Sequence, residues 1–197
     1  MIKEDYDDIF SNGYFLEGTK VPVYVCELPQ EIKQEIEVGV ELCDKIENHP
    51  LKRLKQHSNE GKNSFQVSMP LPWFLNSFLF PYLVHLGKYY NYKCNKVLFD
   101  KMRGQINIQG LFNKEHDYGV WLNYAYKGDF NPEHNHPCLI AGVIYVENTE
   151  GEPTLFKDGT KFYGKPGQVI IFPGYFRHGV GIKETLGRRL TIAFNLD

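Results

Sequence analysis

The chain has 197 residues, of which 42% are hydrophobic and 15% aromatic, and its net charge is −2. A chain of this size and composition can bury a substantial core, so we expect a single domain over residues 1–197. The nearly balanced charge gives no basic footprint of the kind that nucleic-acid-binding proteins carry, so nucleic acid is not indicated as a partner.

Residues 1–117 are predicted to form a scaffold of helices and strands. Apolar residues at helical spacing, from Ile32 to Cys43, predict an amphipathic helix over residues 29–48. A second apolar stripe from Leu75 to Tyr90 predicts another helix, which Pro81 kinks or divides. Polar residues interrupt this stripe, so we expect no membrane span, and the helices should buttress one side of a β-structure.

The C-terminal part of the chain contains several short runs typical of strands, separated by Gly, Pro, Asn and Asp. These runs cover residues 120–126, 139–146, 153–156, 168–172, 178–182 and 189–196. Their spacing indicates one continuous β-architecture over residues 118–197.

Two histidines stand two positions apart beside a turn, as His134-Asn135-His136-Pro137. Side chains at i and i+2 of an extended strand point to the same face, so both imidazoles can converge on one ion. A third imidazole, His178, follows the strand-like run 168–172. A lone His-x-His pair is more often surface decoration than a ligand pair, but the strand context favours a metal held by all three histidines.

Several spaced motifs together resemble the 2-oxoglutarate- and Fe(II)-dependent oxygenases of the double-stranded β-helix superfamily, in particular a subgroup whose first metal motif is His-x-His. The motifs are Trp121-x-Asn123, Gly128 to Asn131, His134-x-His136-Pro137, Gly142 to Val146, Gly167 to Pro173, His178, and Arg189-x-Thr191-x-Ala193-Phe194-Asn195.

The resemblance implies an α+β protein with a double-stranded β-helix, or jelly-roll, core over residues 118–197, buttressed by N-terminal helices. It also implies that His134, His136 and His178 form a catalytic centre holding Fe(II), with 2-oxoglutarate as cosubstrate. The expected reaction uses dioxygen to hydroxylate a protein side chain or a small metabolite, and it releases succinate and CO₂.

One position departs from the common pattern of that superfamily, because His136 stands where most members have a carboxylate ligand. Three neutral imidazoles leave the site one charge unit more positive than usual, which favours a dianionic cosubstrate. Glu133 is an alternative source of a carboxylate, although its odd number should point it away from His134 in a regular strand. The favoured ligand set is His134, His136 and His178.

The terminal strand offers an arginine for the cosubstrate. Arg189 and Thr191 share one face of the run 189–196, and the other face is apolar. A guanidinium binds a carboxylate bidentately and Thr191 adds a hydroxyl, so we predict that they hold the distal carboxylate of 2-oxoglutarate. An ordinary strand-end ion pair is the alternative for Arg189. Arg188 falls on the apolar side at the strand's edge and is expected to face solvent.

By analogy with the family, Tyr145 and Asn123 would complete the cosubstrate pocket. Tyr124 would replace Asn123 if the opposite face of its strand turns inward.

Two other functions remain open. Gly128 and His134-x-His136 fit the start of the first cupin motif, but the glutamate expected four or five positions later is absent. A cupin-type dioxygenase with three histidines would not use 2-oxoglutarate, and it leaves Arg189-x-Thr191 without a role. A non-catalytic binding protein on the same fold is the third possibility.

The four cysteines, Cys26, Cys43, Cys94 and Cys138, show no Cys-x-x-Cys spacing, which predicts reduced thiols rather than a zinc ribbon or a disulfide scaffold. The acidic segment 1–8 lacks the basic and apolar regions of a signal peptide. Together these features predict a cytoplasmic protein, and the resemblance implies that its partner is a small molecule or a protein side chain.

Overall fold

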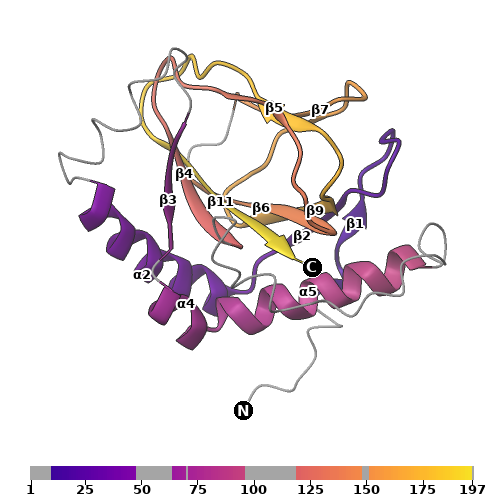
Figure 1. Ribbon diagram of the computed structural model, residues 1–197, viewed down its shortest axis with the longest axis horizontal. Coiled ribbons are helices and arrows are strands. Elements are labelled where there is room, and N and C mark those ends of the chain that lie inside the picture. Colours follow the sequence, from indigo (N-terminus) through magenta and orange to yellow (C-terminus); the bar gives the residue numbers. More distant parts are fainter. Residues whose placement is uncertain (1–9, 48–63, 70, 96–118, 148–150, 197) are drawn as a thin grey trace.

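The computed structural model describes residues 10–47, 64–69, 71–95, 119–147 and 151–196. These residues form a seven-stranded and a four-stranded antiparallel sheet, with helices packed along one face of the larger sheet (Figure 1). The double-stranded β-helix core with buttressing helices that the sequence predicted is therefore confirmed.

Within the described segments, the larger sheet is covered by helices α2 (Gln30–Glu47), α4 (Leu71–Asn76) and α5 (Leu79–Asn95). Helix α2 confirms the helix predicted over residues 29–48. The second predicted helix is divided, but the break lies at Ser77-Phe78 rather than at Pro81. Pro81 lies in the first turn of α5, where the N–H that proline lacks would have no partner within the helix. No helix of the described segments is long and apolar enough to cross a membrane.

The larger sheet has the strand order β1-β2-β9-β6-β11-β4-β3. Its members are β1 (Tyr14–Phe15), β2 (Tyr24–Glu27), β9 (Gln168–Pro173), β6 (Ile140–Glu147), β11 (Arg189–Leu196), β4 (Val120–Ala125) and β3 (Phe65–Ser68). The smaller sheet has the order β5-β10-β7-β8, with β5 (Asn131–His134), β10 (His178–Val180), β7 (Thr154–Phe156) and β8 (Lys161–Phe162).

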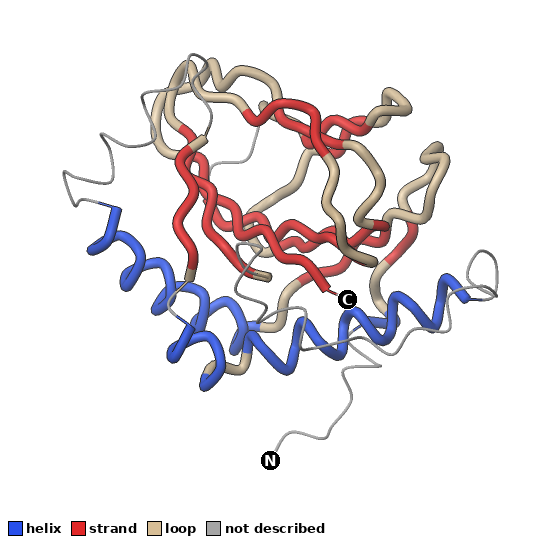
Figure 2. Tube along the Cα trace, viewed as in Figure 1, coloured by secondary structure: helices blue, strands red, loops and turns tan. Residues whose placement is uncertain are grey.

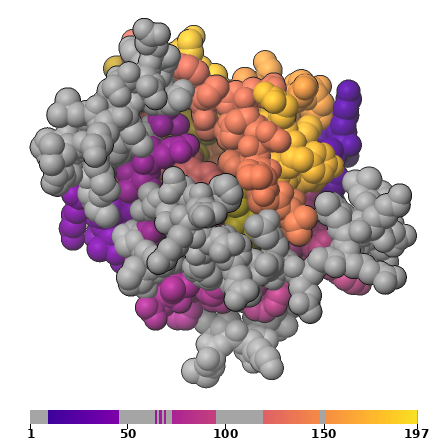
Figure 3. Space-filling model, in the orientation of Figure 1, coloured from indigo at the N-terminus to yellow at the C-terminus, as the bar shows by residue number. Residues whose placement is uncertain are grey.

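All the strands predicted from the sequence are confirmed within two residues at each end, as β4, β6, β7, β9, β10 and β11. The sequence analysis did not assign β5 and β8, and it did not foresee that β1, β2 and β3 from the N-terminal half join the larger sheet. Figure 2 shows the two sheets facing each other above the helices. In the space-filling view the orange and yellow residues of the C-terminal half likewise lie above the magenta helices (Figure 3).

Side chains along the central strands alternate between the two faces of the larger sheet, and each face contributes to a separate apolar core. Leu122, Ile144 and Phe194 point toward the helices and pack with residues such as Ile36 and Leu83. The intervening positions point between the sheets, where another cluster gathers around Tyr145, Phe156, Phe162 and Phe172. Burying each large apolar side chain contributes roughly 1.5–3 kcal/mol, so the two clusters fix which face of each strand is turned inward.

An aromatic ring approaches the backbone closely within the helix-facing core. Gly142 on β6 lies directly opposite Phe194 on β11, and the Phe194 ring occupies the space that a Cβ atom on Gly142 would need. A glycine at this position lets the ring lie flat against the neighbouring strand.

Candidate metal centre

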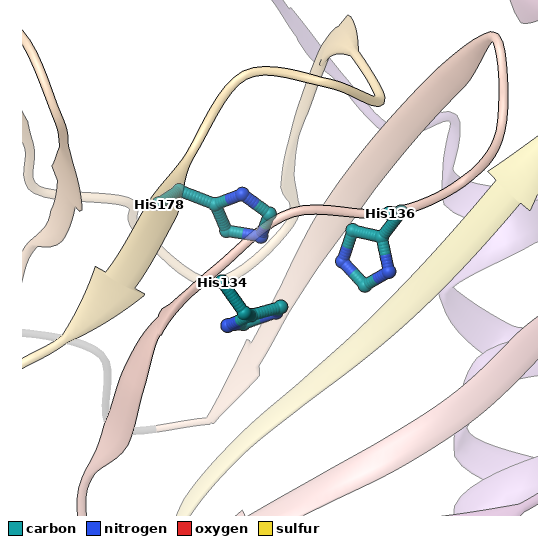
Figure 4. Close-up of side chains that lie close together, drawn as sticks. All are labelled: His134, His136 and His178. Carbon is teal, nitrogen blue, oxygen red and sulfur yellow. The ribbon is translucent and has the colours of Figure 1, made fainter.

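Three imidazoles gather between the two sheets. His134 ends β5, His136 follows two residues later, and His178 begins β10. His134 and His178 are direct partners across the β5–β10 pair. Candidate ligand atoms of the three side chains all lie within 4.8 Å of one another, and the rings face a common point (Figure 4).

Backbone carbonyls fix the protonation of two of these rings. Nδ1 of His134 lies 2.7 Å from the carbonyl oxygen of Pro132, and Nδ1 of His178 lies 3.0 Å from that of Phe176. A carbonyl oxygen only accepts, so each Nδ1 must carry the proton and donate it. The Nε2 lone pair of each ring is then available to a metal ion.

Burial favours the neutral form of two of the three rings. It lowers the pKa of His178 to about 3 and that of His136 to about 4, and repulsion from the neighbouring imidazoles adds to both shifts. A ring must be unprotonated to coordinate a metal, so these shifts favour coordination.

Aromatic side chains form the walls of the centre. The Phe172 ring meets His178 edge to face at a centroid distance of 4.7 Å, and the Trp121 indole lies 5.7 Å from the His136 ring. Phe172 comes from β9 and Trp121 from β4, so the larger sheet supplies the packing that holds the rings in place.

The alternative ligand Glu133 lies outside the cluster. Its carboxylate accepts a hydrogen bond of 2.6 Å from Nε of Arg177, and both side chains are largely exposed. The local geometry of β5 therefore agrees with the parity argument that separated Glu133 from His134. That His134, His136 and His178 bind a metal stays a prediction.

The predicted cosubstrate residues lie side by side on the inward face of the larger sheet. Thr191 on β11 pairs with Asn123 on β4 and with Tyr145 on β6. Arg189 is the preceding inward position of β11, and all four residues are at least nine-tenths buried. Tyr124 faces the other way, where its hydroxyl donates to Asp44 of α2, so Asn123 is the inward residue of that pair.

Arg189 is a buried cation without a counter-charge of its own. It is 4% exposed, its Nε has no hydrogen-bond partner, and it forms no ion pair within the described ranges. The strand-end ion pair considered from the sequence is thus not found there. Burial lowers the pKa of Arg189, while Tyr145 and Glu152 oppose that shift. An isolated buried charge is costly, and an anionic ligand would offset that cost.

The nearby carboxylate of Glu152 is already engaged. It lies 3.4 Å from the Nζ of buried Lys183 and accepts a hydrogen bond of 2.9 Å from Thr185. Tyr145 is also fixed, because its hydroxyl lies 2.6 Å from that of Thr154 on β7. Arg189 therefore remains the cation of this region that is available to a ligand.

The expectation that Arg188 faces solvent is wrong. Instead of facing solvent, it is half-buried and contacts Glu147 at 2.6 Å and Asp44 at 2.8 Å. The chain enters β11 on the side of the sheet that α2 covers, so a long side chain there reaches the carboxylates at the helix–sheet boundary. The alternation of side chains along the strand predicted the correct face for Arg188, but it did not predict the contacts with Glu147 and Asp44.

Comparisons with known proteins give similarity of fold only. No protein-family model matches the chain, and no curated protein sequence matches it. The structure is similar to that of a "Putative oxygenase" from Shewanella oneidensis, with a TM-score of 0.54 and 14% identity over 90% of this chain and 82% of that one. A 2OG-Fe(II) oxygenase family oxidoreductase from Burkholderia pseudomallei has a TM-score of 0.42 and 15% identity, over 97% and 75% of the respective chains. A TM-score of 0.42 is too low to support a conclusion about this protein.

Proposed function

We propose that this protein is a 2-oxoglutarate- and Fe(II)-dependent dioxygenase that hydroxylates a protein side chain or a small metabolite. The observation that carries the proposal is the combination of two features on opposite sheets. His134 and His178 from the smaller sheet and His136 from the segment after β5 converge, and the buried Arg189 guanidinium, which forms no ion pair within the described residues, faces inward from the larger sheet. A metal-chelating ligand with a distal carboxylate would engage both.

The donor set fits a divalent transition metal. Imidazole suits iron, zinc, copper and nickel, so the three rings alone do not select iron. Three neutral ligands leave the full charge of any divalent ion to balance dianionic 2-oxoglutarate, so charge alone does not select iron. Iron is proposed because the reaction with dioxygen needs a redox-active metal. His134, His136 and His178 would hold the ion, with the Nδ1 protons of His134 and His178 directed away from it.

Arg189 and Thr191 would hold the distal carboxylate of the cosubstrate. The guanidinium supplies charge and directional N–H groups, and the Thr191 hydroxyl supplies a further donor on the same strand face. Asn123 and Tyr145 flank Thr191 on the adjacent strands and would limit the width of the pocket. The aromatic walls would keep water away from the reacting atoms.

Bound Fe(II) would supply the redox chemistry that couples 2-oxoglutarate decarboxylation to substrate oxidation. One oxygen atom of dioxygen enters succinate and the other enters the hydroxylated product, with CO₂ released from the cosubstrate. The identity of the substrate and a cytoplasmic location stay predictions.

A cupin-type dioxygenase is the second candidate, because such enzymes also use three histidines. It leaves the buried Arg189 without a function. Succinate formation separates the two: protein reconstituted anaerobically with Fe(II) should convert 2-oxoglutarate to succinate when dioxygen is admitted, and His178→Ala protein should not. Stoichiometric iron binding without succinate would reject the dioxygenase proposal and favour the cupin or the non-catalytic binding protein.

A further inference from the structure

The inward face of the larger sheet continues past the residues assigned to the cosubstrate. Along β11 the inward positions after Arg189 and Thr191 are Ala193 and Asn195. Ala193 pairs with Trp121 on β4, and Asn195 is the diagonal neighbour of that tryptophan. Diagonal neighbours of an antiparallel pair lie about 7–8 Å apart, so one small group can contact both side chains.

Trp121 stands beside the candidate metal centre with an unused donor. Its ring lies 5.7 Å from that of His136, and its Nε1 is buried without a hydrogen-bond partner in the part of the chain that the structure describes. A buried N–H without an acceptor destabilises a fold by about 1–3 kcal/mol, so its retention requires an explanation. A phenylalanine would provide the same packing without that cost.

Asn195 presents a matching unused group. Its Oδ1 is also buried without a hydrogen-bond partner, while its backbone N–H donates to the carbonyl of Gly119 at 2.8 Å. The side chain is thus held on the strand with its amide uncommitted at that oxygen. Trp121 offers a donor and Asn195 an acceptor, which is the pair that an amide group needs.

Among the described residues, the sheet positions that neighbour Trp121 and Asn195 on the inward face hold no charged side chain. The inward positions of β4, β6 and β11 beyond Thr191 are Trp121, Ala141, Val143, Ala193 and Asn195. Two of them are alanines, which leave the sheet surface low beneath the imidazoles. Such a surface favours a neutral group over an anion, in contrast to the Arg189 end of the same strand.

We propose that Trp121 and Asn195 form a subsite for a neutral amide group of the primary substrate, next to the metal. The inference rests on the proposed dioxygenase function, because it treats Arg189 and the imidazoles as the cosubstrate and metal sites. The Trp121 indole donates to the amide oxygen, and the Asn195 oxygen accepts from the amide nitrogen. This identifies the substrate as an amide-bearing molecule, such as a protein side chain that ends in a carboxamide.

Nuclear magnetic resonance of the indole N–H groups tests the subsite directly. The chain has two tryptophans, so ¹⁵N-labelled protein gives two indole signals, which Trp121→Phe and Trp73→Phe assign. The protein is loaded with diamagnetic Zn²⁺ and 2-oxoglutarate and is titrated with acetamide, acetone and acetate. These probes share a shape but differ in donors and charge.

Acetamide should shift the Trp121 indole proton downfield and should bind more tightly than acetone or acetate, while the Trp73 signal stays in place. The Asn195→Leu variant should lower the acetamide affinity about tenfold, the effect of one lost neutral hydrogen bond. An unchanged Trp73 indole signal and an unchanged thermal unfolding transition in this variant before titration would show that it is folded.

Three results would overturn the subsite. They are no acetamide shift, equal affinity for the three probes, or a Trp121 shift produced by 2-oxoglutarate alone, which would place Trp121 in the cosubstrate site. Failure of the dioxygenase proposal is a separate result. In that case 2-oxoglutarate would give no charge-transfer band with the Fe(II) protein, and the acetamide titration would be read on protein loaded with metal alone.

Discussion

His134 and His178 are cross-strand partners on β5 and β10, and each keeps Nε2 free by donating its Nδ1 proton to a carbonyl. We expect one Fe(II) per chain, and loss of that iron in His134→Ala and in His178→Ala, because two imidazoles bind far more weakly than three. Metal analysis of protein purified without oxygen measures this. His85→Ala, on the exposed side of α5, is the control and should keep its iron. Unchanged occupancy in both site variants would contradict the assignment.

His136 occupies the position at which a carboxylate is common, so His136→Asp should preserve or improve iron binding by restoring two histidines and one carboxylate. Glu133→Ala should also keep the metal, because Glu133 is paired with Arg177 at the surface. Iron titration of both variants beside His136→Ala decides between the two ligands. The reverse pattern, with iron lost only in Glu133→Ala, would make Glu133 the third ligand.

Arg189 and Arg188 are neighbours in sequence but lie in different environments, which makes them a matched pair. Arg189→Ala should weaken 2-oxoglutarate binding by roughly thirty- to several-thousand-fold, equivalent to about 2–5 kcal/mol, and should leave iron in place. Arg188→Ala should lower thermal stability by freeing Asp44 and Glu147 while leaving the affinity unchanged. The visible charge-transfer band of the anaerobic Fe(II) protein reports binding. Equal weakening by both variants would mean that the strand register is wrong.

At the scale of an element, the packing of β6 against β11 depends on the contact between Gly142 and Phe194. Gly142→Ala should destabilise the protein by about 1–3 kcal/mol, because the added methyl group must displace the Phe194 ring from the helix-facing core. Thermal unfolding followed by circular dichroism measures the change. The double variant Gly142→Ala/Phe194→Leu should lose less than the sum of the two single changes, since the smaller side chain leaves room for the methyl group. Simple additivity would show that the two residues do not share this space.

Elements with a local signal could be predicted from the sequence. Alternation over residues 189–196 assigned both faces of β11 correctly, and turn residues bounded six strands. The pairing of β3 with β4 joins Ser68 to Trp121, and no local pattern encodes a contact between such distant segments. The same holds for β2 beside β9. Non-local pairing is set by the whole core, and so it emerged only in the folded chain.

Side-chain contacts also fall into those that a local sequence pattern predicts and those that depend on the packing of distant segments. The convergence of His134, His136 and His178 followed from strand parity and a family resemblance, and the structure brings the three together. The contact of Arg188 with Asp44 depends on how α2 packs against the sheet, so no local sequence pattern predicts it. Trp121 was visible only as part of a motif. Its position two residues before Asn123 already placed it on the inward face.

The whole molecule should respond to acid through its buried imidazoles. In the metal-free protein the pKa of His178 is lowered to about 3 and that of His136 to about 4, whereas an imidazole in the unfolded chain titrates near 6.5. The unfolded state therefore binds more protons below pH 6.5. This contribution to stability is fully present above that pH and is lost as the pH falls toward 3, at up to about 1.4 kcal/mol per pH unit for the buried His178.

Urea unfolding at pH 7, 6 and 5 measures this loss. The His178→Leu variant should show a shallower decline, because the position no longer titrates. An identical decline in the two proteins would assign the acid sensitivity to other groups.

Two of the candidate metal ligands, His134 and His178, lie on the smaller sheet, whereas Arg189 lies on the larger one, and aromatic rings pack between the two sheets. Phe156 of β7 meets Phe172 of β9 edge to face at 5.3 Å, and Phe172 also contacts His178. The thickness of this aromatic layer determines the separation between the imidazoles and Arg189, and therefore the length of a molecule that can contact both. We expect the selection between dicarboxylates of different chain length to depend on these rings, even though the rings need not contact either carboxylate.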